Sequence, residues 1–303
     1  HVDLEGGGGQ TAKELDKLKE KGAISLWNSA TITYENVTTD RLVAVTNLTS
    51  PDDQLGLKPG KLMFFRHVVI RQLALVGLVC LCVSGSVFPP ALQHGMALFG
   101  AGAMLLHLAT LIFANRIDAF LQFRPVRKDK HGEDRWARRQ AGRLLGAYLC
   151  GIPVQAVAKA EGGLREVLVY GRREGPWDYR ELQESIARDG FLSAGLSPDA
   201  VYRQCVVQMM GLVAEYVKYG QATEGFRNMA LLERNLAFVQ KPMSRGHRQM
   251  LARLGLIIAY RLLQEHRVAF ESVVERFKQH EPLPSIVAAL ESAPRTPRLT
   301  PAA

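Results

Sequence analysis

The predicted fold depends on residues 71–116, which have the sequence RQLALVGLVCLCVSGSVFPPALQHGMALFGAGAMLLHLATLIFANR. The 44 residues between Arg71 and Arg116 include no Asp, Glu, Lys or Arg, although charged residues make up 22% of the chain. A bilayer core about 30 Å thick requires roughly 20 apolar residues of helix, so this stretch is long enough for two spans and a short connection. It therefore predicts a two-helix transmembrane hairpin.

Pro89 and Pro90 divide the stretch, because proline removes a backbone donor and disfavours helix at the residue before it. We expect spans over about 68–88 and 92–114. A buried hairpin in a soluble core is the alternative, but soluble helices of this length usually carry a charged face. Small residues let membrane helices approach closely, and four are expected at the contact between the spans: Gly77, Gly95, Gly100 and Ala101.

Basic residues flank both spans, whereas the connection at Pro89-Pro90 has none. By the positive-inside rule, both arms of the chain are expected on the cytoplasmic or matrix side. A basic segment beside a span favours anionic lipid over nucleic acid, and cardiolipin is the expected lipid in a mitochondrial membrane. Six residues are expected to contact lipid headgroups: Arg66, Arg71, Arg116, Arg124, Arg127 and Lys128.

The compartment follows from this sidedness. The chain begins at His1 without Met, so we expect a processed or truncated product. A secretory signal would deliver the new N-terminus to the side opposite the one that the charges favour, whereas a mitochondrial presequence is removed in the matrix. The sequence thus favours the mitochondrial inner membrane with both termini in the matrix. The alternative is a bacterial inner membrane with both termini in the cytoplasm.

The expected fold class is a mainly α membrane protein with minor α+β elements. Residues 1–57 are expected to form a small N-terminal α/β arm, and residues 58–130 the hairpin with its basic flanks. In the arm, Thr11–Glu14 matches a capping box that would start a helix ending near Gly22. Three β-prone runs follow and suggest a small sheet: Ala23–Leu26, Thr31–Tyr34 and Leu42–Thr46.

Residues 131–177 are expected to be a basic linker with a β-hairpin, formed by Val154–Ala158 and Arg165–Tyr170. Residues 116–143 hold nine basic and four acidic residues, and with Trp136 they suggest a collar at the membrane interface. Residues 178–292 are predicted to form a helical domain and 293–303 a disordered tail. The helices of the 178–292 domain are expected from Pro198 to Gly220, over 224–239, and from Arg245 to His280.

The sequence contains no Walker loop, G-x-G-x-x-G, G-x-S-x-G or zinc-protease pattern. We therefore predict a protein that is not an enzyme and has no catalytic, metal or cofactor residues, with bound phospholipid as its one associated small molecule. The net charge of +9 suits an anionic partner. Two spans are too few for a transporter monomer, and polar arms tethered to a membrane suit a scaffold.

The first functional hypothesis is an accessory subunit of a large mitochondrial inner-membrane complex, either a respiratory-chain complex or the ATP synthase. Its expected partners are other subunits of that complex and anionic lipid, with no nucleic acid. The alternatives are a membrane-bound assembly factor for such a complex, a membrane-anchored enzyme or an oligomeric channel.

Overall fold

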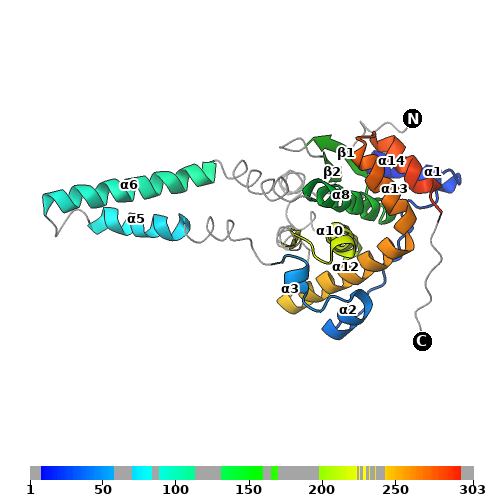
Figure 1. Ribbon diagram of the computed structural model, residues 1–303, viewed down its shortest axis with the longest axis horizontal. Coiled ribbons are helices and arrows are strands. Elements are labelled where there is room, and N and C mark those ends of the chain that lie inside the picture. The colour runs from blue at the N-terminus through cyan, green and yellow to red at the C-terminus, as the bar shows by residue number, and fades with distance from the viewer. Residues whose placement is uncertain are drawn as a thin grey trace. The chain divides into compact units, whose positions relative to one another are not determined.

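The computed structural model describes residues 8–57, 70–83, 89–112, 131–159, 165–169, 198–223 and 243–294, with five further residues between 225 and 236. Within these ranges the chain forms ten helices and one two-stranded sheet, so the fold is mainly α-helical (Figure 1). The chain divides into two compact units. Unit 1 consists of His1–Lys58 and Glu133–Ala303, and unit 2 consists of Pro59–Gly132.

Unit 1 contains eight of the described helices and both strands. The N-terminal helices are α1 (Gly8–Glu20), α2 (Thr39–Thr46) and α3 (Pro51–Gln54). The elements that follow unit 2 in the chain are α8 (Gly132–Leu149), β1 (Val154–Lys159), β2 (Arg165–Val169), α10 (Pro198–Tyr219), α12 (Arg245–Glu265), α13 (Arg267–Lys278) and α14 (Leu283–Ser292).

Helix α10 is the centre of unit 1. All residues from Gln204 to Glu215 are buried, because α8 packs on one side of the helix and α12 on another (Figure 1). A Cβ added at Gly142 of α8 would lie 2.7 Å from the Met210 carbonyl oxygen, and one at Gly255 of α12 would lie 3.1 Å from that of Cys205. These glycines let the backbones approach closely, so the core is tightly packed.

Of the helices predicted after residue 197, the first is present as α10 and the last is divided into two. Helix α10 ends before Gly220, whose φ of +73° is the left-handed conformation typical of a helix C-terminus. The helix predicted from Arg245 to His280 is instead two helices, α12 and α13, which meet at the buried His266. After the break, Phe270 and Phe277 of α13 are buried in the core. The helix predicted over 224–239 lies largely outside the described residues.

The predicted strands of the N-terminal arm are wrong for the described residues 8–57, which contain helices and irregular backbone. The run Leu42–Thr46 belongs to α2, because the Thr38 hydroxyl caps this helix by accepting from the Arg41 amide. In the segment before α2, Asn28 and Ala30 donate backbone hydrogen bonds to the carboxyl-terminal end of α8 instead of to a strand.

The predicted capping box at Thr11 is also wrong, because α1 already begins at Gly8 and Thr11 is buried within it.

The basic linker predicted from residue 131 is corrected over 132–149, which form the buried helix α8. Trp136 is 3% exposed and donates its indole N–H to the Arg165 carbonyl at 2.6 Å, so its side chain packs inside unit 1. The strands predicted after α8 are present as β1 and β2, which pair antiparallel with Val157 opposite Val167. Residues 295–303 of the predicted tail lie outside the described residues.

Candidate membrane-anchoring surface

The described part of unit 2 consists of helices α5 (Arg71–Val83) and α6 (Pro90–Ile112). Only α6 among the described helices is long and apolar enough to cross a membrane, through Leu92–Ala109, of which 11% is buried. Helix α5 is apolar but has 13 residues, which is short of a full span, and residues 68–69 and 84–88 of the predicted first span lie outside the described ranges. The structure therefore provides one candidate span where the sequence predicted two.

Helices α5 and α6 pack closely on each other through Gly77 and Gly100. A Cβ added at Gly100 would lie 2.6 Å from the Gly77 carbonyl oxygen, and one added at Gly77 would lie 2.7 Å from the Ala103 Cβ. Such distances are too short for any side chain, so the contact requires small residues.

Two of the four residues predicted for this contact lie elsewhere. An added Cβ at Gly95 would meet nothing within 4 Å, and Ala101 is exposed. Among the described side chains of α6, Gly100 and Ala103 are the buried ones, and a shift of one residue rotates a side chain by about 100° around the helix. Small size alone therefore could not identify which small residues face α5.

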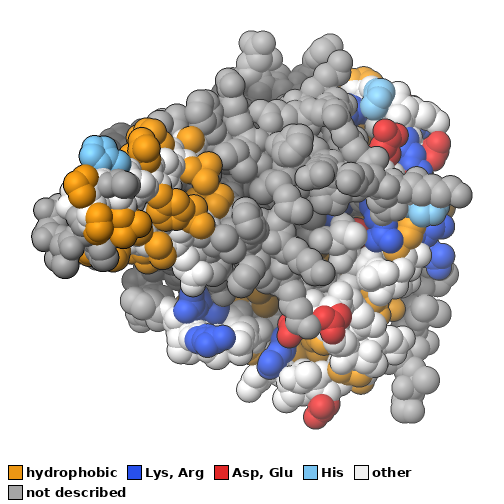
Figure 2. All heavy atoms as spheres, turned by 60° about the vertical axis from the view of Figure 1, so that its left-hand side comes forward, with side chains coloured by type: hydrophobic (Ala, Val, Ile, Leu, Met, Phe, Trp, Pro, Cys, Tyr) orange, Lys and Arg blue, Asp and Glu red, His pale blue; other side chains and the backbone are white. Residues whose placement is uncertain are grey.

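The outward faces of α5 and α6 are apolar. Thirteen of the sixteen exposed large hydrophobic side chains in the described part of the chain lie on these two helices. Leu98 is 75% exposed and Leu105 is 66% exposed. Figure 2 shows hydrophobic side chains gathered over this part of the molecule. The thirteen residues are Leu73, Leu75, Val76, Leu78, Val79, Val83, Leu92, Leu98, Phe99, Met104, Leu105, Leu106 and Leu108.

This arrangement can associate with an apolar phase. Water-soluble monomers rarely expose contiguous apolar patches larger than a few hundred Å², and larger patches mark contacts with a membrane or another protein. The helices have an apolar exterior, while small residues form their mutual contact. We name the thirteen side chains the apolar exterior of α5–α6.

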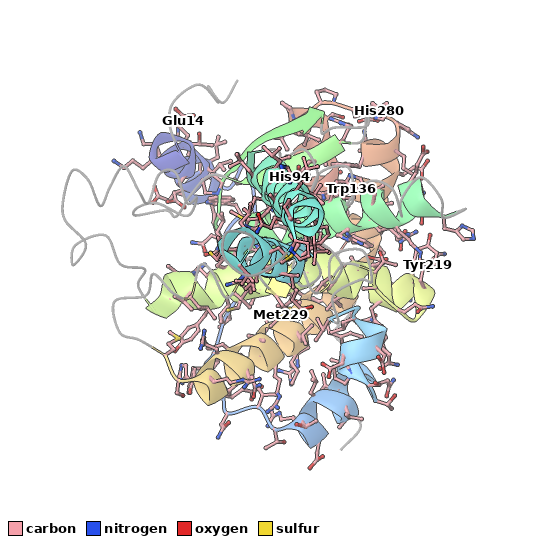
Figure 3. All side chains as sticks on the ribbon, turned by 90° about the vertical axis from the view of Figure 1, so that its left-hand side faces the viewer. Glu14, His94, Trp136, Tyr219, Met229 and His280 are labelled. Carbon is pink, nitrogen blue, oxygen red and sulfur yellow. The ribbon has the colours of Figure 1, made fainter. Side chains whose placement is uncertain are left out.

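Of the residues predicted to contact lipid headgroups, Arg71 is described. It is the first residue of α5 and is exposed, as expected for a side chain at the end of a span. The others lie outside the described residues: Arg66, Arg116, Arg124, Arg127 and Lys128. His94, labelled on α6 in Figure 3, has its Nδ1 2.6 Å from the Pro90 carbonyl oxygen, so its contact is within the first turn of the helix.

Unit 1 contains a buried carboxylate that the sequence did not identify. Glu215 of α10 is 0% exposed, and its Oε1 accepts from Arg135 at 3.0 Å and from the Thr223 hydroxyl at 2.9 Å. Its Oε2 accepts from Nη2 of Arg139 at 2.6 Å and from Nε of the same side chain at 3.2 Å. Four donors thus satisfy this carboxylate, and the cluster joins α8 to α10.

Asp134 forms a second charged cluster at the amino-terminal end of α8. Its carboxylate accepts hydrogen bonds from Arg138, Lys278 and Tyr219, the last of which is labelled near the end of α10 in Figure 3. Burial alone would raise the pKa of Asp134, but these donors outweigh burial and lower the pKa to about 2. Burial and the nearby Asp134 carboxylate raise the pKa of Tyr219 to about 12. Neither group would exchange a proton near neutral pH.

The buried thiols of unit 1 are likewise unreactive. Burial raises the pKa of both Cys150 and Cys205 to about 12, which keeps them protonated at neutral pH. Among the residues that the structure describes, no group of three His, Cys, Asp or Glu side chains is placed to hold a metal ion.

Comparison of the chain with known proteins found no matching family model, no matching curated protein and no matching solved structure.

Proposed function

We propose that the protein is an integral membrane protein, anchored by a transmembrane hairpin built on α5 and α6, and that it is a non-catalytic accessory subunit of a large inner-membrane complex. The observation that carries this proposal is the apolar exterior of α5–α6. Exposing apolar surface to water costs about 25 cal/mol per Å² of free energy. In lipid this cost disappears, because the hydrocarbon tails are as apolar as the surface itself.

Two further observations support a hairpin. Pro89 and Pro90 separate the two apolar segments, and Gly77 and Gly100 allow the close approach that neighbouring membrane helices use. Within unit 1, the segments that precede and follow unit 2 in sequence are held at the same end of α10. There the Ala222 amide donates to the Gln54 carbonyl at 2.6 Å, and Arg135 donates to the Gln221 carbonyl at 3.0 Å. This placement suits two arms that remain on one side of a membrane.

The scaffold role is supported by how unit 1 uses its charges. Glu215 and Asp134 are engaged by cations from the same unit, and both hold α8 against α10. A unit braced in this way suits a rigid support for neighbouring subunits. We place the protein in the mitochondrial inner membrane with both termini in the matrix, or in a bacterial inner membrane with both termini in the cytoplasm, in contact with anionic lipid such as cardiolipin.

Native electrophoresis of solubilised membranes, followed by mass spectrometry of the band, tests the subunit role. The expected result is comigration with a respiratory-chain complex or the ATP synthase at a fixed stoichiometry that survives purification. Presence in partly assembled complexes alone would identify an assembly factor instead. Migration of the protein by itself would contradict both roles.

A further inference from the structure

Unit 1 contains a small cavity, of about 70 Å³, among four of its helices. One water requires about 10–15 Å³ by the same measure, so the cavity has room for several waters or for a group of about five heavy atoms. Its lining includes Arg138 of α8 and residues of α10, α12 and α13, among them Lys218, Arg267 and Glu271.

The cavity has an excess of positive charge. Arg138 forms a bidentate ion pair with Glu271, with N–O distances of 2.8 and 2.9 Å, and a second ion pair with Asp134 at 3.0 Å, so its positive charge is compensated. Lys218 and Arg267 are exposed at the cavity, and neither side chain forms a hydrogen bond or an ion pair with another described residue. Two cations thus remain uncompensated beside walls that include Ala214, Val217, Leu263 and Phe270, and apolar walls strengthen the attraction for an anion.

We propose that this cavity binds a phosphate group through Lys218 and Arg267. A guanidinium supplies paired N–H donors in a planar fork, and an ammonium supplies a mobile point charge, a combination well suited to phosphate oxygens. The Arg138–Glu271 pair forms one wall and keeps Arg138 fixed.

The phosphate could come from an anionic phospholipid or from a free phosphate. The lipid source deepens the proposed function and rests on it, because the cavity lies at the end of α10 where the segments flanking unit 2 are held. Binding of free phosphate does not depend on membrane anchoring.

The test compares the full-length protein with two double variants. K218Q/R267Q removes both cations of the cavity. The matched control, K13Q/K17Q, removes two exposed lysines of α1, which lie one helical turn apart and outside the cavity lining. Because all four side chains are on the surface, near-identical circular dichroism and thermal unfolding are expected and serve as the folding check.

Titration calorimetry of the detergent-purified protein measures its affinity for inorganic phosphate. Native mass spectrometry of protein released from nanodiscs measures lipid retention, with nanodiscs of phosphatidylcholine alone or with added phosphatidylglycerol. We expect K218Q/R267Q to lower phosphate affinity by on the order of tenfold or more, and K13Q/K17Q to leave it within about twofold. Retention of phosphatidylglycerol by the wild type and not by K218Q/R267Q would identify a lipid headgroup as the source.

Equal phosphate binding and equal phosphatidylglycerol retention by the wild type and K218Q/R267Q would overturn the proposal, as would displacement of phosphate by an acidic peptide at lower concentration. If the wild-type protein bound phosphate but did not associate with membranes, the proposed anchoring would be contradicted, whereas the phosphate site in the cavity would be supported.

Discussion

Helices α6 and α12 have similar lengths, 23 and 21 residues, but opposite arrangements of their apolar side chains. Helix α12 buries Leu254, Ile257 and Leu263 inside unit 1, while Arg261 faces solvent. Among the described side chains of α6, the buried residues are Gly100 and Ala103, and leucines face outward. A helix in water usually buries its apolar residues, and the reversed pattern of α6 is the basis of the proposed membrane anchoring.

The comparison extends to the forces that hold each unit together. In unit 1, charges on α8, α10 and α13 meet in ion pairs inside or at the edge of an apolar core. In unit 2, α5 and α6 have no charged residue between Arg71 and Ile112 and meet through small residues. Unit 1 should therefore be sensitive to loss of a buried charge, and unit 2 to gain of a charge or of volume.

The largest expected effect is loss of the buried charge. Glu215→Gln leaves Arg139, whose side chain is 4% exposed, without its compensating carboxylate. Removing one partner of a buried ion pair typically destabilises a protein by about 3–5 kcal/mol. Denaturant unfolding of the detergent-purified protein, followed by tryptophan fluorescence, measures this change.

The control for that variant is Glu275→Gln on the exposed side of α13, which should change the free energy of unfolding by less than about 0.5 kcal/mol. Similar changes for the two variants would mean that Glu215 does not hold unit 1 together.

The next effect is gain of a charge at an exposed apolar position. Leu98→Arg on α6 and Val268→Arg on α13 both replace exposed apolar side chains, so in water neither should matter. If α6 spans a bilayer, Arg near its centre is unfavourable by about 2.5–3.5 kcal/mol. Extraction of membranes at alkaline pH should then release Leu98→Arg but retain Val268→Arg. Equal retention of both variants would argue against a lipid-exposed α6.

The sequence predicted those features that depend on neighbours along the chain. Helix α10 was predicted because apolar residues recur every three or four positions between Pro198 and Gly220. Gly77 and Gly100 were predicted to lie at a helix contact because small residues are typical of membrane helix pairs, and the structure places both there.

Features that depend on distant residues were missed. Arg139 and Glu215 lie 76 residues apart, so the charge pattern around Arg139 suggested a linker although its partner makes it part of a core. The runs Ala23–Leu26 and Thr31–Tyr34 were wrongly predicted as strands. Between them, the amides of Asn28 and Ala30 find acceptors at the end of α8 rather than on a strand. In both cases a tertiary contact overrode a correct local pattern.

Added volume at the helix contact should have an intermediate effect. Gly100→Ala brings a Cβ to 2.6 Å from the Gly77 carbonyl oxygen, whereas Gly102→Ala on the same helix meets nothing within 4 Å. Both variants gain the same helix propensity, so the difference in stability between them reports the steric conflict alone. We expect Gly100→Ala to be less stable than Gly102→Ala by about 1–3 kcal/mol. Amide hydrogen exchange of α5 and α6 peptides in nanodiscs measures it without interference from unit 1. Equal exchange rates would show that the close contact is absent.

The smallest expected effect is the pH dependence of the Asp134 cluster. The pKa of about 2 in the folded protein lies below the usual value near 3.9, so Asp134 stabilises unit 1 above that value, and this contribution is lost as the pH falls toward 2. Because 24% of the side chain is exposed, solvent screening reduces the contribution to about 1 kcal/mol.

Asp134→Asn should remove this contribution, because its amide does not titrate. Between pH 5 and pH 2 the wild type should lose about 1 kcal/mol more unfolding free energy than Asp134→Asn, measured by denaturant unfolding at each pH. Asp199→Asn, at a carboxylate that is 68% exposed, is the control and should follow the wild-type curve. If Asp134→Asn also followed that curve, the acid sensitivity of unit 1 would come from other carboxylates. Charge would then brace its core through Glu215 but contribute little at the end of α8.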